Sequence, residues 1–173
     1  MEFKNLLQKN SEEFWKNYLP TLSIDCVIFS FHENKLQVLT LKMKDCEQYG
    51  LPGGYVEKTE NVDDAAVRIL KERTGTEDIY LQQFHVFGNL NRSESAFEKY
   101  DDTIWYKQRF VSIGYYALAE YGKVKLYIDE YSSIVKWHSI ENLPEFMMDH
   151  RIIFDKALLT LQEQLNNRPI GYN

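Results

Sequence analysis

The sequence predicts an α/β fold in which a mixed central sheet is covered by helices. Three observations predict it: an early pair of apolar stretches joined by a short turn, a helix-forming segment followed by more apolar stretches, and a final amphipathic segment. A chain of 173 residues corresponds to one domain and can bury a core. We assign residues 1–20 to an N-terminal helical segment, 21–166 to the domain itself and 167–173 to a tail.

The first elements are a helix and a hairpin. Apolar residues at helical spacing predict a helix over 1–20, which Pro20 closes. Residues 24–31 are apolar at alternate positions on both faces, which indicates a strand in the middle of a sheet. Glu33-Asn34 then predicts a turn, and 36–43 the returning strand.

The clearest helix is expected over 62–74. Asn61 is a suitable N-cap, and Asp63 lies in the first turn, where the helix dipole favours negative charge. Gly75 occupies the position at which helices commonly end in the left-handed conformation. The remaining expected elements are strands over 79–87, 110–118, 124–128 and 134–140, a long polar loop over 89–108, and a helix over 150–165.

Composition narrows the classes of function. The net charge is −6 and the pI about 5.3, and the sequence has no cluster of Lys and Arg. We therefore expect the chain alone to bind nucleic acid poorly. No apolar run is long enough for a membrane span, so we expect no membrane partner. Two cysteines, Cys26 and Cys46, and the absence of a signal-peptide pattern favour a cytoplasmic location.

The segment from 54 to 75 carries the most specific pattern. Its fixed positions are Gly54, Glu60, Arg68, Leu70, Glu72 and Gly75, and Leu51-Pro52-Gly53 precedes them. This spacing resembles the Nudix box, and the tract 137–144 before the last helix is similar to the usual ending of that family. The resemblance implies the Nudix fold, an α/β/α sandwich around a mixed sheet.

The resemblance also implies a chemistry that this sequence has partly lost. Nudix hydrolases cleave diphosphates linked to a nucleoside, with Mg²⁺ held by three glutamates on one helix face. At those positions this chain has Ile69, Glu72 and Arg73, so the local charge is 0 rather than −3. Glu72 is therefore the one candidate metal ligand, a weak one, and the one candidate catalytic residue if the protein is active.

The other box residues are assigned by the same resemblance. Glu60, Arg68 and Gly75 are expected to be structural, with Glu60 and Arg68 forming an ion pair that braces the loop against the helix. Gly53, Gly54 and Arg73 are candidate ligand-binding residues, and the Arg73 guanidinium could hold a phosphate in place of the metal.

Simpler interpretations exist for the same residues. Ile69 could be a core residue, Glu72 an exposed partner of Arg68, and Arg73 a charge favoured at a helix C-terminus. Four aromatic residues could stack a base or sugar, although core packing is the more common role. These are Tyr100, Trp105, Tyr106 and Phe110. The histidines show no metal-ligand spacing; they are His32, His85, His138 and His150.

Several segments resemble a subgroup, the Nudix-related transcription regulators, which join a Nudix effector domain to a winged helix. The segments are 62–66, 68–75, 109–118 and 169–173. The resemblance implies an effector-binding domain, catalytically weak or inactive, that senses an ADP-ribose-like nucleotide or a sugar without a required cofactor. It also implies a homodimer, and DNA binding only through a winged helix that this sequence does not contain.

Two alternatives remain. One is a Mg²⁺-dependent Nudix hydrolase that cleaves ADP-ribose or another nucleoside diphosphate derivative with carboxylates outside the box. Candidates for those carboxylates are Glu94, Glu98, Asp101 and Asp102. The other is a binding scaffold without a small ligand.

Overall fold

The computed structural model describes residues 3–75 and 79–167. Of the predicted tail over 167–173, Asn167 is the last residue of the final helix, and residues 168–173 lie outside the described residues. No helix in the described part of the chain combines the length and hydropathy needed to cross a membrane.

A mixed sheet forms the centre of the molecule, as predicted. Its main path runs β3 (Tyr49–Gly50), β2 (Lys35–Met43), β1 (Tyr18–His32), β6 (Val111–Leu118) and β5 (Tyr80–Phe87). Two further strands, β4 (Gly53–Glu57) and β7 (Ser132–Ser139), pair with β1 and β2. The central strand β1 runs parallel to β6 and antiparallel to β2 and β4, which confirms its expected central position.

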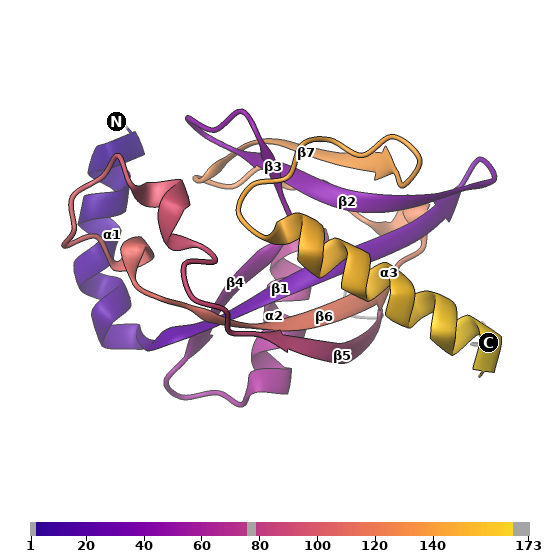
Figure 1. The fold of residues 1–173 in the computed structure, drawn as a ribbon, viewed down its shortest axis with the longest axis horizontal. Coiled ribbons are helices and arrows are strands. Elements are labelled where there is room, and N and C mark those ends of the chain that lie inside the picture. The colour runs from indigo at the N-terminus through magenta and orange to yellow at the C-terminus, as the bar shows by residue number, and fades with distance from the viewer. Residues whose placement is uncertain (1–2, 76–78, 168–173) are drawn as a thin grey trace.

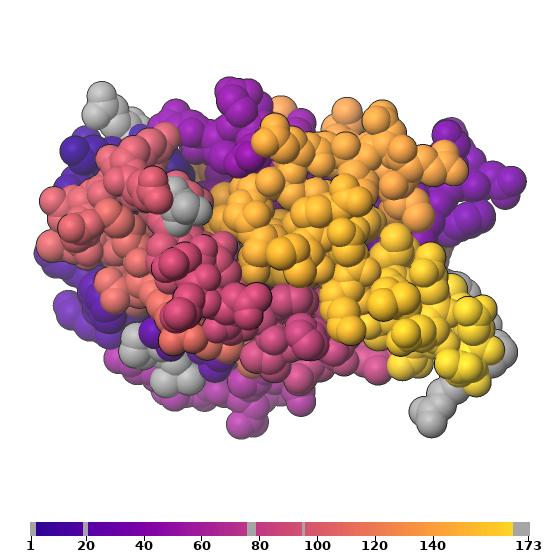
Figure 2. All heavy atoms as spheres, viewed as in Figure 1, coloured from indigo at the N-terminus to yellow at the C-terminus, as the bar shows by residue number. Residues whose placement is uncertain are grey.

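One helix covers each face of this sheet (Figure 1). Helix α2 (Val62–Thr74) packs Ala65, Ile69 and Leu70 against one face, and its bounds agree with the prediction. Helix α3 (His150–Asn167) packs Ile153, Phe154, Ala157 and Leu161 against the other face. Figure 2 shows α3, in yellow, lying across the surface of that face. The layers are therefore α/β/α, as the sequence led us to expect.

Helix α1 (Phe3–Asn17) lies beside the sheet and packs against the 89–108 segment (Figure 1). That segment was predicted to be a polar loop, and this prediction is wrong in part. It contains the short 3₁₀ helices η1 (Glu94–Phe97) and η2 (Trp105–Lys107), and its aromatic side chains form a third apolar cluster with Leu7 and Phe110. The segment is thus a packed wall of the domain.

Three other expectations need correction. The first helix ends at Asn17, because Leu19 precedes a proline and Tyr18 already pairs with Glu57 of β4. Strand β4 was not foreseen, since its two glycines favour a turn. No strand forms over 124–128: the short 3₁₀ helix η3 (Tyr121–Lys123) leads into this segment, and its Lys125 N–H donates to the carbonyl of Thr74 at the end of α2 rather than to a strand.

The other boundaries agree closely with the sequence pattern. The turn at Glu33-Asn34 connects β1 and β2, and both residues adopt positive φ angles. Gly75 ends α2 with a φ of 68°, and its N–H donates to the carbonyl of Lys71. The residue at the N-cap is Asn61, although its side chain bonds Asp64 rather than the helix backbone.

Candidate functional site

A cavity of about 580 Å³ opens where β1 and β4 meet the C-terminal half of α2. Its walls include Ser23–Asp25 of β1, Gly53–Tyr55 of β4, part of α1, and residues 129–132, which lead into β7. The predicted residues Gly53, Gly54, Arg68, Glu72 and Arg73 all line it. Glu60 and Gly75 do not.

Two glycines allow the backbone to come close at this place. A Cβ on Gly53 would lie 2.6 Å from the carbonyl oxygen of Ile24, and one on Gly54 would lie 2.9 Å from Cγ1 of Ile69. Any larger residue would therefore push β4 away from β1 or α2. The glycines are required by close packing, not by an unusual backbone angle.

The Glu60 and Arg68 side chains join the β4–α2 loop to the helix. Arg68 Nη2 and Nε donate to the Glu60 carboxylate at 2.6 and 3.0 Å, and Nη2 also donates to the carbonyl of Tyr55 at 2.9 Å. Glu60 in turn accepts from the N–H of Glu57. The hydrogen bond from Arg68 is the main cause that lowers the pKa of Glu60, so this carboxylate stays charged.

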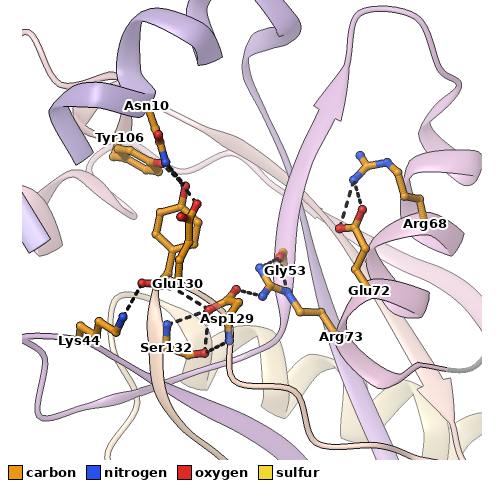
Figure 3. A network of polar contacts seen from close by, with 11 residues as sticks. Asn10, Lys44, Gly53, Arg68, Glu72, Arg73, Tyr106, Asp129, Glu130 and Ser132 are labelled. Atoms are coloured by element: carbon orange, nitrogen blue, oxygen red, sulfur yellow. Dashed lines mark hydrogen bonds and ion pairs between the residues drawn. The ribbon is translucent and has the colours of Figure 1, made fainter. Parts of the chain in front are cut away.

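Arg73 is bound to oxygen atoms of the cavity wall (Figure 3). Its Nε and Nη2 donate to the carbonyl of Gly53 at 3.3 and 3.1 Å, and its Nη1 donates to the Asp129 carboxylate. Burial opposes ionisation of Asp129, but the charge of Arg73 and hydrogen bonds from Ser132 outweigh it and lower the pKa of Asp129. A carbonyl and a carboxylate are oxygen ligands of the kind that hard cations use, and here a guanidinium binds both.

The remaining box positions do not suit a metal ion. Ile69 is 1% exposed and belongs to the core, while Glu72 is 56% exposed on its side chain and pairs with Arg68 at 3.3 Å. Within residues 3–75 and 79–167, no three His, Cys, Asp or Glu side chains are grouped so that they could hold a metal ion. The donor set therefore does not fit the Mg²⁺ that the resemblance implies for an active hydrolase.

A buried polar cluster, which the sequence analysis did not identify, lies at another side of the cavity. Arg92 makes a bidentate ion pair with Asp149 at 2.8 and 2.9 Å and contacts Asp25 at 3.3 Å. The N–H of Leu51 donates to Nδ1 of His150 at 2.7 Å. Burial lowers the pKa of His150, so the ring is neutral at pH 7 and carries its proton on Nε2.

The aromatic candidates are mainly packing residues. Trp105 is fully buried between α1 and Tyr55, and Tyr100 lies outside the cavity. Tyr106 and Phe110 do line the cavity, each about 4% exposed. They form an apolar wall rather than an open stacking platform.

The four carboxylates proposed for the hydrolase alternative are directed elsewhere. None of Glu94, Glu98, Asp101 and Asp102 lines the cavity. Asp101 accepts from Thr103, and Asp102 pairs with Lys107. The structure does not bring these carboxylates to the box.

Some signals for the missed residues were present in the sequence. Asp25 is the one charged residue in the mainly apolar stretch 24–31, and a charge in a central strand needs a reason. Arg92 lies in the segment 89–108, for which the sequence predicts a long polar loop, so no pattern marked it as buried. Asp129 follows the segment mistaken for a strand, so its position against Arg73, 56 residues earlier, could come only from the fold.

Comparison with known proteins gives a consistent result. A family model described as NUDIX domain matches residues 19–157. The ADPR responsive transcriptional repressor NtrR of Acinetobacter baylyi is 27% identical over 156 residues, which is 86% of this chain and 56% of that protein. The ADP-ribose pyrophosphatase of Methanocaldococcus jannaschii is 36% identical over 76 residues, 42% of this chain and 43% of that enzyme.

A solved structure is similar over nearly its whole length. It is the NUDIX domain of Shewanella oneidensis NrtR complexed with ADP ribose, with a TM-score of 0.66 and 26% identity, covering 87% of this chain and 97% of that one. The chain spans about half the length of the curated relatives it matches. The similarity to that domain confirms the expected fold.

Proposed function

Because the chain belongs to the NUDIX family, we propose that it is an effector-binding domain of this family, which senses an ADP-ribose-like nucleotide or a sugar for a transcription regulator. The similarity to an ADPR responsive repressor and to a NUDIX domain complexed with ADP ribose supports this class of ligand. In this proposal the domain is catalytically weak or inactive and needs no cofactor to bind its effector.

The observation that carries the proposal is the place of Arg73. Its guanidinium binds the carbonyl of Gly53 and the carboxylate of Asp129, at the position where the box of a hydrolase has a carboxylate. A divalent cation brought to these oxygens would meet a positive charge, and unit charges about 4 Å apart near a surface repel by roughly 1–4 kcal/mol. Binding that depends on a metal is therefore disfavoured here.

Arg73 can still contact a ligand. A guanidinium has five N–H donors, and the contacts to Gly53 and Asp129 use three of them. The two that remain belong to Nη1 and Nη2 and are suited to a phosphate oxygen. Together with the close backbone at Gly53 and Gly54, Arg73 would hold the diphosphate of an ADP-ribose-like effector.

The same proposal includes the cellular location, the oligomeric state and the DNA binding of such a domain. We place the protein in the cytoplasm as a homodimer, and we assign DNA binding to a winged helix outside these 173 residues. The net charge of −6 agrees with that division, because phosphate affinity requires clustered positive charge.

One experiment distinguishes the proposal from the hydrolase alternative. The similarity to an ADP-ribose pyrophosphatase supports that alternative. ADP-ribose binding is measured by calorimetry in EDTA, and AMP release is measured with Mg²⁺ or Mn²⁺, with an active Nudix hydrolase as assay control. We expect binding in EDTA and no useful AMP release. Turnover near the ~10 s⁻¹ median of enzymes would replace the sensor with a hydrolase.

A further inference from the structure

The carboxylate of Asp25 has one oxygen without a partner inside the cavity. Its Oδ2 accepts from Ser112 Oγ at 2.5 Å and from Arg92 at 3.3 Å. Its Oδ1 accepts no hydrogen bond from the described residues, and His150 Nε2 lies 3.9 Å away. Asp25 is 8% exposed and lines the cavity, so a ligand there would be the natural donor for Oδ1.

A second polar group of the cavity wall lacks a partner among the described residues. Ser93 lines the same cavity and is 6% exposed, and within residues 3–75 and 79–167 its hydroxyl finds no hydrogen-bond partner. It follows Arg92 directly in the chain, and Arg92 contacts Asp25. A buried polar atom without a partner is uncommon in proteins and often marks the place of a bound group.

The local charge selects the type of ligand. Asp25, Asp149 and Arg92 sum to −1, and the neutral His150 adds nothing. Two carboxylates face the single guanidinium of Arg92, so this side of the cavity carries a net negative charge, which disfavours a phosphate. A carboxylate oxygen and a hydroxyl instead suit a neutral group rich in O–H donors.

We infer that Asp25, with Ser93, binds the hydroxyl groups of a pentose unit of the effector. This inference rests on the proposed function and names the part of the ligand that this side of the cavity recognises. The pentose is either the terminal ribose of an ADP-ribose-like nucleotide or a free sugar, since both present the same vicinal hydroxyls. In the nucleotide, Arg73 faces the diphosphate and Asp25 the ribose.

A matched pair of variants separates ligand binding from support of the fold. Asp25→Asn and Asp149→Asn both remove a negative charge that faces Arg92, but Asp149 does not line the cavity and makes the closer contacts with Arg92. A merely structural role would make Asp149→Asn at least as damaging. Thermal unfolding of both variants checks that each is folded.

Calorimetry with ADP-ribose, ADP, D-ribose and L-arabinose gives the readout. We expect Asp25→Asn to weaken ADP-ribose or the bound pentose about ten- to a hundredfold, the usual effect of losing a charged hydrogen bond. Asp149→Asn should change it by less than about threefold. Affinity for ADP, which lacks the terminal ribose, should be the same in Asp25→Asn as in wild type.

Equal losses of affinity in the two variants, or no loss in either, would overturn the inference. The proposed function would still stand in that case, provided that the wild-type protein binds ADP-ribose. Wild-type protein that binds none of the four compounds would overturn both. If Asp25→Asn does not fold, wild-type protein is titrated with D-ribose and 2-deoxy-D-ribose. Equal affinity for these two sugars would contradict recognition of vicinal hydroxyls, and a clear loss for the deoxy sugar supports it.

Discussion

The side chain of Ile69 lies directly against the backbone of Gly54. A Cβ on Gly54 would be 2.9 Å from Cγ1 and 3.0 Å from Cδ1 of Ile69. Position 69, where the Nudix box has a glutamate, is therefore part of the core between α2 and β4, and Gly54 provides the space for it. This packing replaces an ionisable group with an apolar contact at the edge of the cavity.

Gly54→Ala should lower the free energy of unfolding by about 1–3 kcal/mol, the usual cost of an added methylene in a packed core. Chemical denaturation measures it. Gly122→Ala is the control, because nothing lies within 4 Å of a Cβ at that position. Adding Ile69→Ala to Gly54→Ala should recover part of the loss expected from summing the two single variants, whereas strict additivity would show that the two residues do not compete for space.

Much of this arrangement could be predicted from the sequence. The bounds of α2, the left-handed Gly75 and the central position of β1 follow from local patterns, namely capping residues and apolar periodicity. The spacing of the box brought Gly54, Glu60 and Arg68 to one place, because a strand, a loop and a helix of fixed length connect them.

The rest depended on contacts between distant segments. The segment 124–128 has strand-like composition, but the N–H of Lys125 bonds the end of α2, which no local pattern reveals. Likewise, Asp129 contacts Arg73, and Asp149 contacts Arg92. The residues of each pair lie more than 50 positions apart in the sequence and meet only because the fold brings their segments together at the cavity. Local sequence showed which residues are charged, not which of them meet.

Arg73→Ala should weaken ADP-ribose binding about ten- to a hundredfold in EDTA, because a charge-assisted contact to phosphate typically contributes about 1.5–3 kcal/mol. Arg151→Ala, which removes an exposed ion pair with Asp155 on α3, is the control and should leave affinity unchanged. Calorimetry provides the measurement, with free pentose titrated beside the nucleotide. Wild-type affinity for the nucleotide in Arg73→Ala would make Arg73 a purely structural link between Gly53 and Asp129.

Restoring the box with Ile69→Glu and Arg73→Glu should make ADP-ribose binding depend on Mg²⁺. The double variant places carboxylates at 69, 72 and 73, near Asp129 and the carbonyl of Gly53, a donor set that suits a hard cation. It should also be less stable without metal, by several kcal/mol, since position 69 is 1% exposed and a buried carboxylate is costly. Denaturation with and without Mg²⁺ tests both effects, and metal that changes neither stability nor binding would show that the helix face cannot be rebuilt in this way.

The stability of the protein should fall between about pH 6.5 and pH 5, and His150 should be a main cause. Burial lowers the pKa of His150 in the folded state below its unfolded value of about 6.5. As the pH drops through 6.5, His150 in the unfolded chain takes up a proton, whereas the buried ring in the folded chain stays neutral. The contribution of His150 to the free energy of unfolding is therefore fully present above pH 6.5 and is lost progressively below it. One such group contributes at most about 1.4 kcal/mol per pH unit.

His150→Asn should flatten this dependence, because asparagine can keep an acceptor for the N–H of Leu51 but has no proton to gain. A weaker slope should remain, since burial also lowers the pKa of His138. Denaturation at several pH values from 7.5 to 5 measures both slopes. Identical slopes in wild type and His150→Asn would show that His150 takes up its proton at the same pH in the folded and the unfolded chain, and the hydrogen bond from Leu51 to its Nδ1 could then not persist at low pH.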